Sequence, residues 1–257
     1  MKYNLAFKYR IYPNKEQELL INKTFGCVRF VYNTILYTAN KFYEETGKNK
    51  IITPASLKSE NQFLKEVDSL ALSNAQLNVK RSFTNFFQKR AKFPRFKSKK
   101  NNVKSYTTNC VNNSIRIEEN KYLVLPKLKR IKLKYHREIP KDYKIKSVTL
   151  TNSNGNYYVS ILTEFEKEIQ KNPSNDKVIG LDFSMSELFV SSENQRADYP
   201  RYFRMLEKKL KKLQKSLSRK VKFSKNWYKQ KAKISKLHEY IKNCRRDFLH
   251  KLSKKLS

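Results

Sequence analysis

An acidic residue at the end of a short apolar segment is the feature of this sequence best suited to catalysis. Residues 178–182 read Val-Ile-Gly-Leu-Asp, which predicts a strand that ends in the carboxylate of Asp182. A carboxylate at the end of a buried strand is costly unless a cation lies beside it. In a protein that binds nucleic acid, the expected cation is a metal ion acting on phosphodiester bonds. Asp182 is therefore predicted to be both a catalytic residue and a metal ligand.

A second group of residues is suited to binding phosphates and bases. Residues 69–117 contain 11 Lys or Arg and no Asp or Glu, and at their centre cations alternate with phenylalanine. Such a run can be only a solvated face, but 49 residues without an acid favour cations on the phosphates and rings stacked on bases. The predicted nucleic-acid-binding residues are Lys89, Arg90, Lys92, Phe93, Arg95, Phe96, Lys97, Lys99 and Lys100.

The composition of the whole chain agrees with a polyanionic partner. Its 257 residues include 57 Lys or Arg against 22 Asp or Glu, a formal net charge of +35. Nucleic acid would relieve the self-repulsion of such a chain, whereas no predicted helix has the Trp and Leu face of a membrane-surface helix. The N-terminus has no continuous apolar stretch, so neither a signal peptide nor a membrane span is expected. We therefore expect a cytoplasmic, nucleoid-associated protein without a small-molecule substrate.

The cysteines and histidines do not form a metal-binding pattern. Cys27, Cys110 and Cys244 are far apart and no Cys-x-x-Cys pair occurs, so no zinc site is expected and the three are predicted to be small core residues. The three histidines have no second ligand at a suitable spacing, and packing or phosphate contact is the expected role. They are His136, His238 and His250.

The sequence patterns around these residues predict strands and helices, and together an α+β fold. Alternating apolar residues from Tyr3 to Ile11 predict a first strand, and Asn14 followed by Gln17 predicts a capped helix. Helical patterns continue over 55–67 and 71–88. Short strands are then predicted between 105 and 165, with a hairpin turn at Asn154 and the glycine after it. The expected architecture is a small β-barrel, closed by the first strand and interrupted by helices.

The C-terminal third predicts a separate unit. Residues 166–177 are polar and are expected to form a linker. Antiparallel strands are predicted at 178–182 and 188–192, followed by two amphipathic helices whose apolar residues recur every three or four positions over 206–217 and 234–248. The two helices form a predicted hairpin of about two heptads each, which is too short for a coiled coil.

Several short motifs occur in an order that resembles one known family. They are Ala-Phe-Lys-Tyr-Arg-Ile-Tyr-Pro at 6–13, Arg-Phe-Val-Tyr-Asn at 29–33, Phe-Pro-Arg-Phe-Lys at 93–97, Gly-Leu-Asp at 180–182, Tyr-Pro-Arg-Tyr at 199–202, Leu-His-Glu at 237–239 and Asp-Phe-Leu-His-Lys-Leu at 247–252. Together they resemble TnpB, also called OrfB, the RNA-guided DNA endonuclease of insertion-sequence transposons that is often described as a transposase. The resemblance covers essentially the whole chain.

The resemblance implies a domain order and partners. A wedge-like β-barrel would comprise residues 1–13 and 101–165, interrupted by a helical recognition lobe at 14–100. After the linker at 166–177, residues 178–257 would belong to a RuvC-like (RNase H-like) nuclease domain with a helical hairpin. The barrel and lobe would bind a guide RNA, derived from the transposon end, and double-stranded target DNA, while base pairing reads the sequence. Ser56 would lie where the family contacts a motif beside the target, although a solvated serine at a helix start is the simpler role.

The resemblance also implies an incomplete catalytic site. Asp182 would be one of three carboxylates that bind two Mg²⁺ ions. The other two are expected beyond the helical hairpin, the last of them after a four-cysteine zinc ribbon, and the sequence ends at Ser257 before these elements. Glu187, Glu193 and Asp198 lie in predicted turns and are not expected to replace them. A C-terminally truncated chain that does not cleave DNA by itself is the expectation.

Two functions remain open at this point. The first is a transposon-encoded RNA-guided DNA endonuclease, represented by a truncated product. The second is a nuclease-dead, RNA-guided DNA-binding repressor or a competitor of the full-length enzyme, against which the intact Asp182 argues. A general RNA-binding protein of ribosomal type is a third interpretation that the ordered motifs disfavour.

Overall fold

The chain divides into two compact units, each with its own strands and helices. The computed structural model describes residues 1–100, 103–168, 178–183, 187–197 and 199–256. Unit 1 is Met1–Ile169 and unit 2 is Gln170–Ser257. Most of the predicted linker, residues 169–177, lies outside the described residues. An α+β fold, as predicted, is present in both units.

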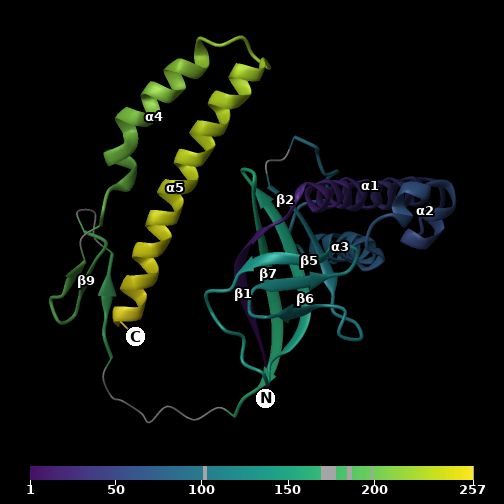
Figure 1. Ribbon diagram of the computed structural model, residues 1–257, viewed down its shortest axis with the longest axis horizontal. Helices are drawn as coiled ribbons and strands as arrows, with labels where there is room; N and C mark the ends of the chain where they lie inside the picture. The colour runs from purple at the N-terminus through teal and green to yellow at the C-terminus, as the bar shows by residue number, and fades with distance from the viewer. Residues whose placement is uncertain (101–102, 169–177, 184–186, 198, 257) are drawn as a thin grey trace. The chain divides into compact units, whose positions relative to one another are not determined.

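Unit 1 is built on an antiparallel sheet of seven strands with the N-terminal strand in the middle (Figure 1). The strand order is β2-β6-β7-β1-β5-β4-β3. Phe7, Tyr9 and Ile11 are buried while their neighbours in β1 are exposed, which confirms the alternation predicted from the sequence. The strands are β1 (Lys2–Tyr12), β2 (Val103–Asn109), β3 (Arg116–Glu118), β4 (Tyr122–Leu125), β5 (Lys129–Lys134), β6 (Lys144–Ser153) and β7 (Asn156–Glu166).

The predicted hairpin turn is confirmed between β6 and β7. Asn154 and Gly155 have φ angles of 51° and 81°, the left-handed values that a two-residue hairpin turn of this kind requires. The turn sets the pairing of β6 with β7, with Ser153 opposite Asn156. This hairpin then provides the edge on which β1 pairs along ten residues.

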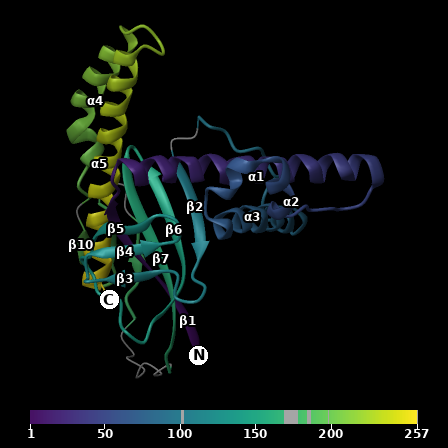
Figure 2. The same ribbon diagram turned by 45° about the vertical axis from the view of Figure 1, so that its right-hand side comes forward.

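The sheet of unit 1 is open in the described residues, whereas the sequence predicted a closed barrel. The pairing order has two ends, β2 and β3, and within the described residues no pairing joins them. The strands form a curled open sheet, in which β1 bridges the β6–β7 hairpin to β5 (Figures 1 and 2). β3 has only three residues, and β2 packs its side chains against helices, so neither end completes a barrel.

The helices of unit 1 follow β1 directly. They are α1 (Lys15–Thr46), α2 (Pro54–Glu60), the 3₁₀ helix η1 (Gln62–Lys65) and α3 (Ser69–Phe87). The predicted capping box of α1 is confirmed: Asn14 and Gln17 each accept the other's backbone N–H. Gln17 Nε2 also donates to the carbonyls of Leu128 and Arg130, at 3.0 and 2.8 Å, and so fixes the start of α1 against the sheet.

The predicted helix over 55–67 is interrupted. Asn61 leaves the helical conformation, with φ −122° and ψ 78°, and its side chain donates to the carbonyl of Leu57 at 3.0 Å. Asparagine competes for backbone hydrogen bonds in this way, which divides the segment into α2 and η1. In both ribbon views α3 runs alongside α1 (Figures 1 and 2).

A buried carboxylate joins α3 to the sheet. Asp68 caps α3 by accepting the backbone N–H of Leu70 at 3.0 Å, and its other oxygen accepts the hydroxyl of Thr108 on β2. Asn74, one turn along α3, reaches Asn109 of the same strand. The helical insertion is therefore tied to the sheet by hydrogen bonds as well as by apolar packing.

Unit 2 consists of a small sheet and a long helical hairpin. Its strands β8 (Leu181–Asp182), β9 (Phe189–Ser191) and β10 (Arg196–Ala197) are antiparallel, in the order β10-β9-β8. Helices α4 (Tyr202–Ser218) and α5 (Lys225–Leu256) pack through Leu210, Leu237 and Ile241. The predicted hairpin is confirmed, but the predicted length is wrong for α5, which has 32 residues. The apolar repeat at 234–248 covers only the buried stripe of α5. The helix extends beyond this repeat because no Gly or Pro interrupts it.

None of the helices in the described part of the chain has the length and apolar character needed to cross a membrane.

Candidate nucleic-acid interface

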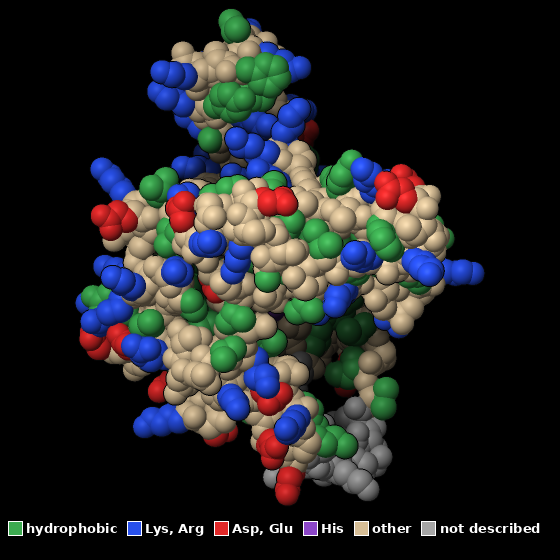
Figure 3. Space-filling view, turned by 90° about the vertical axis from the view of Figure 1, so that its right-hand side faces the viewer, with side chains coloured by type: hydrophobic (Ala, Val, Ile, Leu, Met, Phe, Trp, Pro, Cys, Tyr) green, Lys and Arg blue, Asp and Glu red, His purple; other side chains and the backbone are tan. Residues whose placement is uncertain are grey.

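Cations are widely distributed on the surface, so position rather than number must define an interface. On the face shown in Figure 3, Lys and Arg side chains are interspersed with apolar ones and are not gathered in one continuous patch. The residues predicted to bind nucleic acid, 89–100, have a more specific arrangement. These residues follow the end of α3 and pack against α1 at the Arg-Phe-Val-Tyr-Asn motif of residues 29–33.

The stretch begins with a tight turn at the end of α3. The carbonyl of Asn85 accepts the backbone N–H groups of both Arg90 and Ala91, at 2.8 and 3.2 Å. Lys89 has a φ of 56°, the left-handed conformation that commonly ends a helix. This turn reverses the chain and leaves the side chains of Lys89, Arg90 and Lys92 exposed to solvent.

Phe93 anchors the stretch to the helices. Its ring packs edge-on against Phe83 and Phe86 of α3, with ring centroids 5.9 and 5.2 Å apart. The neighbouring Pro94 is buried, whereas Arg95 and Phe96 are exposed. The Phe96 ring is therefore accessible for stacking on a base, while much of the Phe93 ring is used in packing.

Two sequence motifs, 64 residues apart, are joined by a pair of hydrogen bonds. The side-chain oxygen of Asn33 accepts the backbone N–H of Lys97 at 2.8 Å, and its amide donates to the Lys97 carbonyl at 3.1 Å. The ammonium of Lys97 lies 4.2 Å from the centre of the Tyr32 ring, a cation–π contact. Desolvation lowers the pKa of Lys97 from its ordinary value. Asn33 thus fixes the backbone of the stretch on α1.

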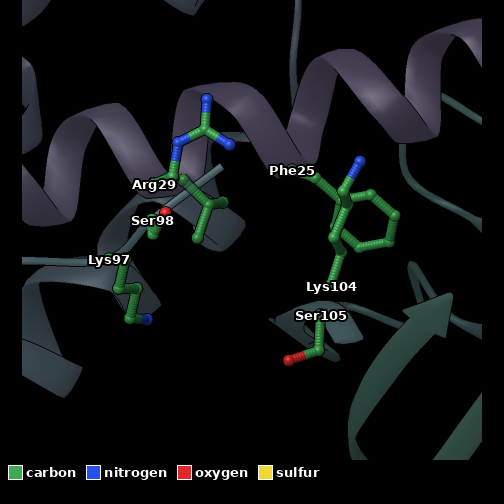
Figure 4. Close-up of a pocket in the computed structure, with 7 residues that line it drawn as sticks. Phe25, Arg29, Lys97, Ser98, Lys104 and Ser105 are labelled. Atoms are coloured by element: carbon green, nitrogen blue, oxygen red, sulfur yellow. The ribbon is translucent and has the colours of Figure 1, made fainter. Parts of the chain in front are cut away.

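A basic pocket lies beside this junction (Figure 4). Its volume is about 220 Å³, and Phe25 and Val28 of α1 form its apolar part. Arg29 follows Phe25 by four positions and lies on the same face of the helix. Lys97 and Ser98 of the basic stretch, with Lys104 and Ser105 of β2, complete the lining. In Figure 4 the charged ends of Arg29 and Lys104 point to the same side, while the Lys97 ammonium points away from them.

This pocket has the chemistry of a phosphate site. The guanidinium of Arg29 and the ammonium of Lys104 supply charge, and the hydroxyls of Ser98 and Ser105 can donate hydrogen bonds. The apolar part adds a surface for a sugar or base. Among the described residues, no salt bridge neutralises Arg29 or Lys104, so both charges remain available for an anion.

The remaining predicted cations are also available. Among the salt bridges of the described residues, none involves the cations of the basic stretch. The structure brings two of the predicted residues, Phe93 and Lys97, into contacts with the helices and leaves the others on the surface. Whether each binds nucleic acid stays a prediction. The others are Lys89, Arg90, Lys92, Arg95, Phe96, Lys99 and Lys100.

Of the three charged residues that line the pocket, the sequence predicted Lys97 as a binding residue but not Arg29 or Lys104. Arg29 was identified only as part of a motif, and Lys104 only as one cation of the acid-free stretch. The helical spacing of Phe25 and Arg29 was a usable signal. No sequence signal indicated that Lys104 lies beside Arg29, because this depends on how β2 packs against α1.

Asp182 lies in a different environment from the one predicted. Only Leu181 and Asp182 form a strand, paired with β9, and the expected burial is absent: Val178 is 88% exposed and Phe183 is 79% exposed. The prediction of a buried strand is therefore wrong for the described residues. Within the described residues, β8 has a strand partner on one side only and its apolar side chains are not covered, so these remain in solvent.

The described residues do not by themselves fit a two-metal centre at Asp182. In the described ranges, no group of three or more His, Cys, Asp or Glu could hold a metal ion. Glu187 pairs with Arg196 at 3.5 Å and Glu193 accepts the side-chain amide of Gln195. Asp198 lies outside the described residues. Asp182 as a Mg²⁺ ligand stays a prediction.

The structure shows the simpler of the two roles predicted for Ser56, a solvated serine at a helix start. It is exposed in the first turn of α2, and its hydroxyl donates to the carbonyl of Thr53 at 2.8 Å. This local bond is typical of serine at a helix start. A contact with DNA from the same position stays a prediction.

Comparison with known proteins gives the family. Residues 160–257 match a family described as "Probable transposase" (OrfB_IS605), and residues 1–48 match its "Helix-turn-helix domain". The chain belongs to this OrfB transposase family, as the sequence motifs predicted. Despite the description of the N-terminal match, its residues form β1 and the single uninterrupted helix α1.

Two bacterial relatives match along nearly the whole chain. "Putative RNA-guided DNA endonuclease InsQ" of Escherichia coli (strain K12) is 36% identical over 268 residues, which cover 100% of this chain and 64% of the relative. A protein of Streptomyces pristinaespiralis, named "Putative RNA-guided DNA endonuclease", is 34% identical over 260 residues, which cover 98% of this chain and 63% of the relative. This chain thus spans a little under two thirds of the length of both relatives.

A solved structure, a "Cas12f1-sgRNA-target DNA complex", aligns with 99% of this chain and 69% of its own, at 12% identity and a TM-score of 0.32. A score this low does not establish a shared fold.

Proposed function

We propose that this chain binds a guide RNA and target DNA, as part of the RNA-guided DNA endonuclease activity for which its relatives are named. The observation that carries the proposal is the junction of α1 with the basic stretch. It places Arg29, Lys104 and two serine hydroxyls around one pocket, beside exposed cations that no described acid neutralises. Phosphate contacts of this kind supply affinity without reading sequence, which suits a protein whose specificity comes from base pairing.

The two units have different proposed roles. Unit 1, with its curled sheet and helical insertion, would hold the guide RNA and the duplex target, and Ser56 would lie near a target-adjacent motif. Unit 2 would be the N-terminal part of a RuvC-like nuclease domain, with the α4–α5 hairpin following its first strands. Its binding of DNA would also place the protein at the nucleoid.

Asp182 is proposed as one ligand of the catalytic Mg²⁺. Divalent ions in such nucleases activate water and stabilise the leaving oxygen. The support is its position, at the end of a strand whose only partner in the described residues is β9. Since a two-metal site needs more carboxylates than one, we expect a polypeptide of residues 1–257 to bind RNA and DNA but to leave target DNA intact with Mg²⁺. Site-specific cleavage by this polypeptide alone would refute that expectation.

The binding proposal is tested by removing the charges of the pocket. The combined change Arg29→Gln and Lys104→Gln should weaken binding of single-stranded RNA and lower the slope of log affinity against log salt by about 0.7 for each lost phosphate contact. The control is Lys127→Gln with Lys141→Gln, which removes two exposed charges elsewhere in unit 1. Equal losses in both variants would show that the pocket is only part of a diffuse positive surface.

A further inference from the structure

The tip of the α4–α5 hairpin exposes aromatic side chains that neither hydrophobic core uses. The core of the hairpin extends through Leu210, Leu213 and Ile234, and does not include the connecting residues. At the tip, Val221 is 79% exposed, Phe223 65% and Tyr228 54%. Burial of such a side chain is worth about 1.5–3 kcal/mol, so a group of them left in water is a candidate contact surface.

The tip has a defined geometry. The hydroxyl of Ser224 accepts the backbone N–H of Trp227 at 3.1 Å, which caps the start of α5. Below the tip, the buried Gln230 donates to the carbonyl of Leu213 at 3.0 Å and joins the two helices. Phe223 has a φ of 71°, a conformation that is rare for a bulky residue and costs of order 1–3 kcal/mol. The strained backbone holds an aromatic ring that stays largely exposed to solvent.

Rings and cations alternate at this tip. The Trp227 ring lies 5.6 Å from Phe223 and 5.1 Å from Tyr228, between centroids. The ammonium groups of Lys222 and Lys231 lie 5.4 and 5.1 Å from the Phe223 and Trp227 rings. Figure 3 shows apolar side chains together with Lys and Arg at this end of the hairpin, at the top of the view.

The charge of the surrounding sequence selects the partner. Residues 208–238 contain 13 Lys or Arg and no Asp or Glu, so the partner must be strongly anionic. Phosphates account for the cations, and unpaired bases account for the exposed rings, since every base offers a face for stacking. A duplex would engage the cations but not the rings, because its bases are already stacked.

We propose that the α4–α5 tip binds unpaired nucleotides of a nucleic acid, with bases stacked on Phe223, Trp227 and Tyr228 and phosphates held by the surrounding lysines. This site is separate from the pocket beside Arg29 and rests on the proposed function for the identity of the nucleic acid, the unpaired part of the guide RNA. It gives unit 2 a binding role that does not depend on Asp182.

The lone tryptophan of the chain makes the site directly measurable. Trp227 is the only Trp among the 257 residues, so intrinsic tryptophan emission reports on the tip alone. A single-stranded oligoribonucleotide of about ten nucleotides should quench this emission, and a duplex of the same length and salt should not. Equal quenching by the duplex would overturn base stacking. Quenching by anionic lipid vesicles and not by the oligonucleotide would assign the tip to a membrane surface and would likewise overturn the proposal.

The matched variants separate this site from the proposed function. Phe223→Gly removes the ring while suiting the positive φ, and combined with Tyr228→Ala it should weaken single-strand binding by about tenfold or more. Met205→Ala, which removes an exposed apolar side chain of α4 away from the tip, should leave binding unchanged. If RNA binding depends on Arg29 and Lys104 but not on the tip residues, the inference fails while the proposed function stands. If the tip variant loses binding and the pocket variant does not, the inference about the tip stands and the binding role proposed for the pocket fails.

Discussion

At the scale of single residues, Asn33 is the side chain on which the proposed interface depends. It satisfies both backbone groups of Lys97 and so converts an exposed basic stretch into a fixed surface on α1. Asparagine suits this role because its amide offers one acceptor and two donors from a single short side chain. The cations near it can then meet phosphates without first losing backbone freedom.

We predict that Asn33→Ala destabilises the protein by about 1 kcal/mol, the usual net value of hydrogen bonds at a partly exposed site. RNA affinity should fall further than stability alone explains, because residues 95–100 would no longer be held in place. Urea unfolding and filter binding measure the two effects. Thr38→Ala on the same helix is the control, and equal RNA affinity in both variants would contradict the role assigned to Asn33.

At the scale of elements, the attachment of α3 to β2 determines where the basic stretch begins. Asp68 is buried, caps α3 through Leu70 and accepts the hydroxyl of Thr108. Asp68→Ala would remove the cap and leave a buried hydroxyl without its acceptor, so we expect a loss of about 2–4 kcal/mol. Thr108→Val should cost less. A double-mutant cycle in urea that gives additive losses would show that the two side chains do not interact.

Buried phenols make the same elements sensitive to alkaline pH. Burial raises the pKa of Tyr9 on β1 and of Tyr106 on β2 above the ordinary value of 10.0, and the charge of Asp68 raises the pKa of Tyr106 further. A phenol with a higher pKa in the folded chain holds its proton more tightly there. The stability it contributes is thus complete below pH 10 and declines as the pH rises from 10 toward the folded value.

The measurement is the free energy of unfolding in urea between pH 8 and 11. The wild-type chain should lose stability across this range, and Tyr106→Phe should lose less, since it lacks one of the titrating groups. Tyr43→Phe, which changes an exposed phenol of α1, is the control. Parallel pH profiles for Tyr106→Phe and the wild-type chain would contradict the assignment.

The elements also show what the sequence could and could not predict. The alternation of β1, the capping box at Asn14 and the turn at Asn154 are local patterns, and all three are confirmed. The open sheet, the full length of α5 and the contact of Asn33 with Lys97 depend on packing between segments far apart in the chain. Motifs therefore identified the family and the basic stretch, whereas the pocket residues Arg29 and Lys104 required the fold.

At the scale of the whole molecule, two separate basic surfaces are proposed for one polyanionic partner. The pocket on unit 1 combines charge with hydroxyl groups, and the tip on unit 2 combines charge with aromatic rings. A net charge of +35 attracts any polyanion, whereas the pocket and the tip define two places where a nucleic acid would bind. The units need not be fixed relative to one another to bind the same strand.

The central claim is that this chain binds a guide RNA through the junction of α1 and the basic stretch. The most direct test is to produce residues 1–257 together with the DNA that flanks their coding sequence, purify the protein and sequence the RNA bound to it. We predict strong enrichment of one RNA encoded at that flank, and its loss in the Arg29→Gln and Lys104→Gln variant. Host RNA bound without enrichment, or an unchanged profile in the variant, would contradict the claim.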